Sequence, residues 1–291
     1  MKILVTGAKG QLGHDVIHEL SKRKYEAVGL DIDDMDITDM NSVTHMIKTT
    51  KPDAVIHCAA WTAVDAAEDC IDQVRLVNAT GTEYIATVCK ELDIKMMYIS
   101  TDYVFNGKGT HFWQADDLDR QPVNIYGQTK YEGELAIERI LDKYFIVRIA
   151  WVFGVNGKNF IKTMLNLGKT RDRLTVVCDQ VGSPTYTSDL AILLVDMIET
   201  DKYGRYHATN EGICSWYELA CEIFSQAASM GHEEYDSAHL TVEPVSSDQY
   251  PTKAKRPANS RMSKDKLIEN GFERLPIWQD AVKRYLHEIE F

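Results

Sequence analysis

Tyr126 and Lys130 are the residues of this chain whose types and spacing most directly suggest chemistry. They stand four positions apart in the segment Tyr126-Gly127-Gln128-Thr129-Lys130, so both should lie on one face of a helix. A phenol has an ordinary pKa of about 10, and a nearby ammonium favours the phenolate and lowers that pKa toward the range useful for acid–base catalysis. The pair therefore predicts a proton donor assisted by a cation.

A glycine-rich turn near the N-terminus supplies the second chemical signal, with the sequence Gly7-Ala8-Lys9-Gly10-Gln11-Leu12-Gly13. It follows an apolar run at residues 2–6, expected to be a buried strand, and precedes helical patterning at residues 11–23. In the order strand, glycine turn, helix, backbone N–H groups and the positive helix end hold a dinucleotide pyrophosphate. A dinucleotide that delivers hydride to a carbonyl needs a proton partner, so the two signals together predict an oxidoreductase.

The elements that must position these residues alternate along the first half of the chain. Apolar runs expected to be strands lie at residues 2–6, 26–31, 53–58, 95–100 and 144–149. Helical patterning lies between them, at residues 11–23, 40–50, 65–92 and 126–141. This alternation predicts an α/β fold, a Rossmann-like doubly wound parallel sheet with helices on both faces. A strand at residues 174–178 and a helix at residues 188–199 are expected to complete it.

The pattern changes after about residue 200. Residues 204–208 and 240–244 resemble short strands, and residues 246–261 form a polar, proline-containing loop. A helix at residues 215–230 has Ser215 as its expected cap, with Glu218 three positions later. These features predict a smaller C-terminal α+β lobe that binds substrate. We expect a dinucleotide-binding domain at residues 1–155 plus about 173–200, and the substrate lobe at about 156–172 and 201–291.

Polar residues at the second strand and in the glycine turn bear on the coenzyme. Ligands of α/β sheets bind at the carboxyl ends of strands, and Asp31 closes the second strand. Its carboxylate could accept hydrogen bonds from the adenosine ribose and would repel a 2′-phosphate, which favours NADH. Lys9 could attract that phosphate, which favours NADPH. The signals oppose each other, so the expected coenzyme is NADPH or NADH, and a plain turn role for Asp31 stays open.

The ends of the next three strands carry small, polar and aromatic residues. After the third strand stands Ala59-Ala60-Trp61-Thr62, where small residues allow backbone to approach a cofactor closely. After the fourth, Thr101 could bond a substrate oxygen near Tyr126, and Asp102 could bond a substrate hydroxyl. After the fifth, Trp151 could stack on a sugar or base. Turn or cap roles for the two polar residues, and a core role for the tryptophan, remain alternatives.

Composition excludes several classes of protein. The 291 residues include 32 basic and 44 acidic side chains, a net charge of −12, which disfavours nucleic acid or anionic membrane as the main partner. Six cysteines at irregular spacings, without a Cys-x-x-Cys pair, indicate neither a zinc site nor a disulfide framework. The N-terminus enters the first strand directly, and no apolar run approaches membrane-spanning length, so we expect a cytoplasmic protein.

Several segments together resemble the dTDP-4-dehydrorhamnose reductase family, within the extended short-chain dehydrogenases/reductases. The glycine turn and YGQTK specify only the superfamily. The segments that narrow the resemblance are TAVDAAE, STDYVFNG, DQVGSPT and RPANSRM, and the resembling stretches span residues 1–262. The resemblance implies reduction of the 4-keto group of a dTDP-linked deoxy-keto-sugar, dTDP-4-dehydro-L-rhamnose, by NADPH or NADH.

The resemblance also implies site residues. Tyr126 matches the general acid, Lys130 the lysine that bonds the nicotinamide ribose, and Thr101 the residue that tunes the phenol. Asp102 and Trp151 match substrate contacts. The positions expected to bind the cofactor are Gly7, Gly10, Gln11, Leu12, Gly13, Asp31, Asp36, Ile37, Ala59, Ala60, Trp61 and Thr62, with Tyr126 and Lys130. Trp61 departs from the smaller or polar residue more common there, which leaves a contact through its backbone.

Metal use and assembly are less specified. Some relatives dimerise through a magnesium ion held by carboxylates, and Asp15 stands near one of those positions. The other ligands cannot be matched, so no metal site is predicted and Mg²⁺ is only a secondary expectation. The chain is expected to be a monomer or homodimer. The basic residues Lys253, Lys255, Arg256 and Arg261 could hold the nucleoside diphosphate, or could simply form a solvated loop.

Two other functions remain open from the sequence. A related nucleotide-sugar epimerase or dehydratase would share the fold and the Tyr/Lys pair. Dehydratases commonly carry Asp-Glu directly after the strand-four threonine, whereas this chain has Asp102-Tyr103, which disfavours that reading. A non-catalytic NADP-binding regulatory subunit is the other alternative, and intact Thr101, Tyr126 and Lys130 argue against it.

Overall fold

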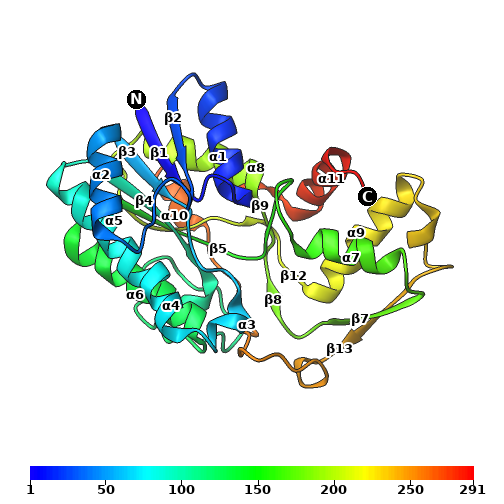
Figure 1. Ribbon diagram of the computed structural model, residues 1–291. Helices are drawn as coiled ribbons and strands as arrows, with labels where there is room; N and C mark the ends of the chain where they lie inside the picture. The colour runs from blue at the N-terminus through cyan, green and yellow to red at the C-terminus, as the bar shows by residue number, and fades with distance from the viewer.

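A six-stranded parallel sheet forms the centre of the computed structural model, which describes residues 1–291 (Figure 1). The strand order is β10-β5-β4-β3-β1-β2. The chain runs outward from β1 to β2 and returns to β3 on the other side of β1, which creates a switch point where ligands bind. The strands are β1 (Lys2–Thr6), β2 (Glu26–Leu30), β3 (Ala54–His57), β4 (Lys95–Thr101), β5 (Tyr144–Ile149) and β10 (Gly204–His207).

Helices cover both faces of this sheet, as the alternation predicted (Figure 1). One face packs against α1 (Gln11–Lys22) and α8 (Thr187–Ile198). The other packs against α2 (Met40–Thr50), α5 (Gly81–Glu91) and α6 (Ile125–Ile140). Ile3, Leu4 and Val5 of β1 alternate between the two cores, so each of them must be apolar, and the middle of the strand appears as a continuous hydrophobic run.

The segment between β3 and β4 differs from the single helical stretch expected at residues 65–92. It contains α3 (Val64–Ala67), α4 (Ile71–Arg75), the π-helical turn η1 (Leu76–Thr80) and then α5. The apolar spacing predicted helix correctly but did not reveal the break after α3. On both sides of that break the chain packs on α6, since α3, α4 and η1 all contact this helix.

A second lobe has its own hydrophobic core and lies beside the sheet in Figure 1. Its elements are α7 (Phe160–Gly168), β7 (Arg173–Val177), α9 (Trp216–Ser229), β13 (Thr241–Val245) and α11 (Trp278–Glu288). The predicted cap of α9 is confirmed: the Ser215 hydroxyl accepts the Glu218 N–H, and the Glu218 carboxylate accepts the Ser215 N–H. This capping box satisfies N–H groups that would otherwise lack partners.

Short elements connect the lobes. Two-residue strands β6 (Val152–Phe153) and β9 (Thr185–Tyr186) pair, as do β8 (Val181–Gly182) and β12 (Cys214–Ser215). A further pair joins β11 (Asn210–Glu211) to β14 (Leu275–Ile277). The remaining elements are η2 (Asp102–Val104), η3 (Glu233–Tyr235), η4 (Ser247–Gln249) and α10 (Asp265–Glu269).

The sixth strand of the large sheet is not the one predicted. β7 overlaps the expected strand at residues 174–178 but pairs with β13 in the second lobe, whereas β10 completes the large sheet beside β5. β7 therefore pairs outside the large sheet to which it was assigned, and β10 belongs to that sheet although it was expected in the substrate lobe. A short strand pattern in the sequence does not indicate which strand it will pair with. The pattern alone therefore assigned both β7 and β10 to the wrong sheet. The remaining boundaries stay a prediction.

Two further findings concern the whole chain. No helix combines the length and the apolar character needed to cross a membrane. All six cysteines are free thiols in the structure.

Candidate active site

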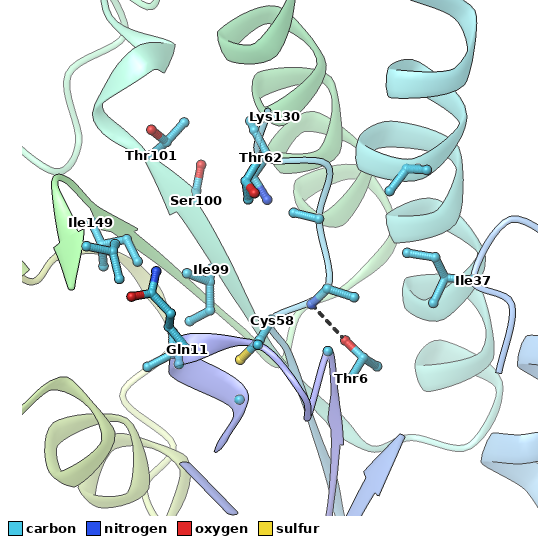
Figure 2. Close-up of a pocket in the computed structure, with 18 of the residues that line it drawn as sticks. Thr6, Gln11, Ile37, Cys58, Thr62, Ile99, Ser100, Thr101, Lys130 and Ile149 are labelled. Carbon is cyan, nitrogen blue, oxygen red and sulfur yellow. Dashed lines mark hydrogen bonds between the residues drawn. The ribbon is translucent and has the colours of Figure 1, made fainter. Parts of the chain in front are cut away.

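A cleft of about 700 Å³ opens at the carboxyl ends of the parallel strands. In Figure 2, Thr101 and Ser100 of β4 and Lys130 of α6 approach it from one side, and Gln11 of α1 from another. The structure brings together every site residue expected from the sequence except Trp61. Those lining the cleft are Gly7, Gly10, Gln11, Leu12, Gly13, Asp31, Asp36, Ile37, Ala59, Ala60, Thr62, Thr101, Asp102, Tyr126, Lys130 and Trp151.

The glycine turn is tight enough to require its glycines. Gly7 has a left-handed φ of +66°, and a Cβ on it would lie 2.8 Å from the backbone nitrogen of Ala59. A Cβ on Gly13 would lie 2.1 Å from the Gly7 carbonyl oxygen. Gly10 is the N-cap of α1 and has no side chain to cap its first turn. The first N–H groups of α1 therefore face the cleft region as donors for an anion such as a pyrophosphate.

Asp31 is held at the end of β2 by backbone groups. Its carboxylate accepts the Lys9 N–H at 2.9 Å and the Ile32 N–H at 2.9 Å. The Lys9 ammonium instead pairs with Asp33 at 2.8 Å, and both of those side chains are exposed. Because water screens an exposed ion pair strongly, Lys9 can exchange this partner for another anion at little cost.

The loop after β3 lines part of the cleft through Ala59, Ala60 and Thr62. The Ala59 N–H donates to the Thr6 hydroxyl at 3.1 Å, the bond drawn in Figure 2. Trp61 does not line the cleft: its backbone N–H donates to Asn78 at 2.8 Å, and its indole N–H donates to the Ala63 carbonyl at 3.2 Å. A cofactor contact for Trp61 stays a prediction.

Tyr126 and Lys130 lie in the first turns of α6, which Asn124 caps by accepting the Gly127 N–H at 2.8 Å. Gly127 allows the helix to begin close to η2, since a Cβ there would lie 2.2 Å from the Tyr103 carbonyl oxygen. Tyr126 is half-buried and meets the Tyr103 ring edge-on at 5.5 Å between centroids. Lys130 is buried, with 2% of its surface exposed.

The pKa of Tyr126 shifts in the direction opposite to the one predicted from the Tyr/Lys spacing. Burial raises the pKa of Tyr126 above its ordinary value, and the Thr101 hydroxyl only partly opposes that effect. Burial also lowers the pKa of Lys130 to about 7, so near neutral pH its ammonium is only partly populated. Desolvation is thus the largest cause of both shifts, and the fold favours the protonated phenol.

Thr101 and Asp102 form a buried hydrogen-bonded set at the end of β4. The Thr101 hydroxyl accepts the Tyr103 N–H at 3.3 Å and donates to the Asp102 carboxylate at 3.0 Å. The other Asp102 oxygen accepts the Ser260 hydroxyl at 2.5 Å. Burial raises the pKa of Asp102 to about 6, although these hydrogen bonds act against the rise. Asp102 therefore carries a proton more readily than an ordinary aspartate.

Trp151 lies where the two lobes meet. Its ring stacks on Trp216, the first residue of α9, with centroids 3.8 Å apart and planes 15° from parallel. Its backbone has a φ of +51°, which is uncommon for a residue with a Cβ and is typical of strain retained at functional sites. The stack fixes one edge of the cleft with groups from both lobes.

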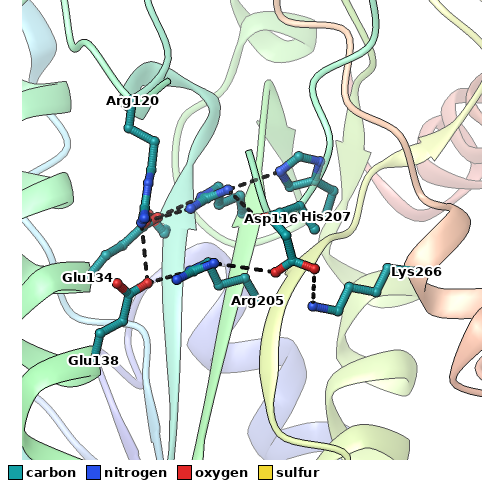
Figure 3. A network of polar contacts seen from close by, with 10 residues as sticks. Asp116, Arg120, Glu134, Glu138, Arg205, His207 and Lys266 are labelled. Atoms are coloured by element: carbon teal, nitrogen blue, oxygen red, sulfur yellow. Dashed lines mark hydrogen bonds and ion pairs between the residues drawn. The ribbon is translucent and has the colours of Figure 1, made fainter. Parts of the chain in front are cut away.

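An ionic network anchors α6 behind the cleft (Figure 3). Glu134, fully buried, accepts the Ser100 hydroxyl at 2.5 Å and two Arg148 N–H groups at 2.7 Å each. Arg120 adds a third cationic contact to Glu134 at 3.3 Å. A buried carboxylate requires such partners, and these ones tie α6 to the strand that ends in Thr101.

The basic residues expected to hold a diphosphate are partly occupied. Lys253 pairs with Asp69, and Arg256 pairs with Asp65 at 2.7 Å while its other nitrogen donates to the Tyr103 hydroxyl at 3.3 Å. Lys255 is exposed. Arg261 donates to Asn259 at 2.9 Å. Arg256 is the member of this run that contacts a residue lining the cleft.

The secondary expectation of magnesium gains no support. Asp15 accepts the Thr187 hydroxyl and contacts His14 at 3.1 Å. No group of three or more His, Cys, Asp and Glu side chains is placed to hold a metal ion.

Sequence reasoning missed three residues that shape the site. Tyr103 lines the cleft beside Tyr126, and Ser260 holds Asp102. Asn78 joins the loop after β3 to α6, because its amide donates to the Trp61 carbonyl and the Thr129 hydroxyl, each at 3.2 Å. Tyr103 and Ser260 fall within STDYVFNG and RPANSRM, two segments that carried the family resemblance, which was the signal available for them.

The sequence and the fold of this chain are similar to those of several known proteins. A family model described as RmlD substrate binding domain matches residues 1–291. The spore coat polysaccharide biosynthesis protein SpsK of Bacillus subtilis is 41% identical, over 99% of this chain and 97% of that protein. The dTDP-4-dehydrorhamnose reductase of Aggregatibacter actinomycetemcomitans is 39% identical, over 97% of each. The crystal structure of dTDP-4-dehydrorhamnose reductase from Bacillus anthracis in complex with NADP has a TM-score of 0.93 and 40% identity, covering 99% of this chain and 100% of that one.

Proposed function

The chain belongs to the family described as RmlD substrate binding domain, and from that premise we propose that it is an NAD(P)H-dependent oxidoreductase. The proposed reaction reduces the 4-keto group of dTDP-4-dehydro-L-rhamnose and gives dTDP-L-rhamnose. Tyr126 is the proposed proton donor. Relatives of this chain that are named dTDP-4-dehydrorhamnose reductase support the choice of substrate.

The observation that carries the proposal is the convergence of three polar side chains on one cleft. Tyr126, Lys130 and Thr101 line it together with the glycine turn, although they come from two different elements. The cleft fits a dinucleotide, because an uncapped helix start lies at one part of it and the Asp31 carboxylate closes β2 at another. A reduced nicotinamide, when bound there, supplies the hydride.

The chain's own residues supply the proton and its environment. The Tyr126 phenol, kept protonated by burial, gives its proton to the sugar O4 as negative charge develops on that oxygen. Lys130, one turn further along α6, stabilises the phenolate that remains. Thr101, whose hydroxyl already bonds Asp102, orders the hydrogen bonds around the phenol and the sugar oxygen. Trp151 and Asp102 are the proposed contacts of the sugar.

The coenzyme is proposed to be NADPH or NADH. Asp31 uses its carboxylate on two backbone N–H groups and still lines the cleft, which suits a ribose 2′-hydroxyl. Lys9 lines the same part of the cleft with an exposed ammonium, which suits a 2′-phosphate. A relative of this chain has been crystallised with NADP, which favours use of NADPH.

The proposal is tested by supplying dTDP-4-dehydro-L-rhamnose with NADPH or with NADH and following the absorbance of the reduced nicotinamide. We expect turnover that needs both the keto sugar and a coenzyme, and none with dTDP-glucose, which has no keto group to reduce. Tight coenzyme binding without turnover would favour the regulatory alternative. No turnover with either coenzyme would contradict the proposed reaction.

A further inference from the structure

The side chain of Lys130 lies against a buried aromatic ring that the proposed mechanism does not use. Its Nζ is 4.0 Å from the centroid of the Tyr98 ring in β4. Tyr98 has no exposed surface, and Lys130 is 2% exposed. A cation within about 6 Å of an aromatic face is attracted by the ring quadrupole, and more strongly where water is excluded. This contact therefore favours the charged form of Lys130.

The Tyr98 ring is held rigidly in this position. Its hydroxyl lies 3.4 Å from the backbone oxygens of both Asn78 and Lys130. The ring also stacks on His57, with centroids 5.6 Å apart and planes 28° from parallel. The His57 nitrogens are in turn bonded to the Thr6 and Thr82 hydroxyls, at 2.7 and 3.2 Å. These contacts hold the Tyr98 ring against the Lys130 ammonium without any bound ligand.

Gly133 explains how α6 comes close enough for this contact. It stands three residues after Lys130, and a Cβ on it would lie 2.6 Å from the Tyr98 hydroxyl oxygen and 2.7 Å from the Asn78 carbonyl oxygen. Glycine is unfavourable inside a helix, so its use here marks a place where close approach matters. Any larger residue would move α6 away from β4 and lift Lys130 off the ring.

The charged and titratable groups around Lys130 offer its ammonium no unshared counter-charge. Glu134, one turn further along α6, raises the pKa of Lys130, but Arg148 and Arg120 already bind that carboxylate and offset its charge. Burial lowers the pKa of His57 to about 3 and raises the pKa of Cys58 to about 12, so both are neutral near pH 7.

Tyr126, the remaining titratable group on this face of α6, is a neutral phenol in the same range because burial raises its pKa. Neither it nor its neighbours therefore provides a full counter-charge for the ammonium. A buried ammonium without such a partner loses its proton more readily, which agrees with the lowered pKa of Lys130.

We propose that Tyr98 is a positioning residue whose ring face holds the Lys130 side chain in place and favours its charged form beside the proton donor. Its meaning for catalysis rests on the reductase function proposed above. Its effect on Lys130 is a property of the chain alone and can be measured without substrate or coenzyme.

The test replaces Tyr98 by phenylalanine and then by phenylalanines with one, two and three ring fluorines. Fluorination weakens the ring quadrupole while almost preserving shape, so the variants should fold even where Tyr98→Leu would leave a cavity. NMR of protein labelled in its lysines, with the Lys130 signal assigned by its loss in Lys130→Arg, reports the protonation of Lys130. We expect Tyr98→Phe to titrate close to the wild type, and the trifluorinated ring to lower the pKa of Lys130 by about one unit, a tenfold change.

The matched control is the same fluorinated series at Tyr206, which is also fully buried in a strand of the large sheet but belongs to the core beneath α8. It should leave the Lys130 titration unchanged. Identical Lys130 titrations across the Tyr98 series would overturn the proposal, whatever the reductase assay shows. If the titration responds but the chain reduces no keto sugar, the proposed function fails and the contact stands.

In an active enzyme, the limb of the pH–rate profile that reports Lys130 should move with its measured pKa across the Tyr98 series. Tyr98→Phe should show the same pH–rate profile as the wild type, since it retains the aromatic ring. A purely structural role would instead lower the rate at every pH without moving the limb, and that result would also overturn the proposal.

Discussion

The surroundings of Tyr126 keep its phenol protonated at neutral pH. Burial raises its pKa, whereas the same burial brings the pKa of Lys130 to about 7. The residue whose protonation changes near physiological pH is therefore the lysine. In the proposed reaction, proton donation by Tyr126 depends on how well the site stabilises the negative charge left on the phenolate, and this is the step at which Lys130 and Thr101 are proposed to act.

Asp102 gives a pH dependence of stability that belongs to this residue. Its pKa is about 6 in the folded chain, against about 3.9 for an ordinary aspartate. Between those values the native chain binds more protons than the unfolded chain, so the free energy of unfolding falls as pH rises from about 4 to about 6. At about 1.36 kcal/mol per unit, the loss is about 3 kcal/mol. Asp102→Asn should remove that loss, as measured by urea unfolding across this range.

A suitable control is Asp142→Asn, because Asp142 is an exposed carboxylate paired with Lys90. Its pKa is lowered rather than raised, so it should leave the slope between pH 4 and pH 6 unchanged. Equal slopes for the wild type and Asp102→Asn would show that Asp102 ionises normally in the fold.

At the scale of elements, the glycine turn and α1 form the part of the cleft most dependent on backbone geometry. Gly13→Ala would place a Cβ 2.1 Å from the Gly7 carbonyl oxygen, so the turn must open. We expect a loss of about 1–3 kcal/mol in the free energy of unfolding, typical of overpacking, together with at least a tenfold weaker affinity for NADPH. Thermal or urea unfolding and a fluorescence titration with NADPH measure the two effects.

Ser215→Ala separates these two effects. It removes the cap of α9 in the other lobe and should cost about 1 kcal/mol while leaving the affinity for NADPH unchanged. Equal affinities for NADPH in the wild type and Gly13→Ala would contradict the proposal that the glycine turn binds the coenzyme.

Elements differed in how far the sequence could specify them. Strands β1 and β3–β5 were predictable because burial on both faces favours runs dominated by apolar residues, and α9 because Ser215 and Glu218 form a local cap. The partners of β7 and β10 were not predictable, since pairing is decided by contacts distant in sequence. The break after α3 was equally hidden, because helical patterning was predicted across residues 65–92 without an interruption.

On the scale of the whole molecule, the two lobes meet around the cleft through pairs of residues far apart in the chain. Trp151 stacks on Trp216, Ser260 bonds Asp102 across 158 positions, and Arg256 bonds Asp65 across 191. The strand ends placed Trp151 and Asp102 at the expected site. Their partners Trp216 and Ser260 could not be found from spacing, because no local pattern connects them to the strand ends. The residues proposed to bind the cofactor, in contrast, cluster near strand ends, where sequence patterns could locate them.

The central claim, that Tyr126 donates the proton in reduction of a keto sugar, is tested most directly by comparing wild type with Tyr126→Phe. Phenylalanine keeps the ring that meets Tyr103 and removes only the hydroxyl. With dTDP-4-dehydro-L-rhamnose and NADPH, we expect kcat to fall by about 10²–10⁴-fold, the usual contribution of a general acid. The Kd for NADPH should stay within about twofold if the helix start and glycine turn provide most of the binding. A kcat that falls by less than about threefold, with NADPH still bound, would contradict the role of Tyr126.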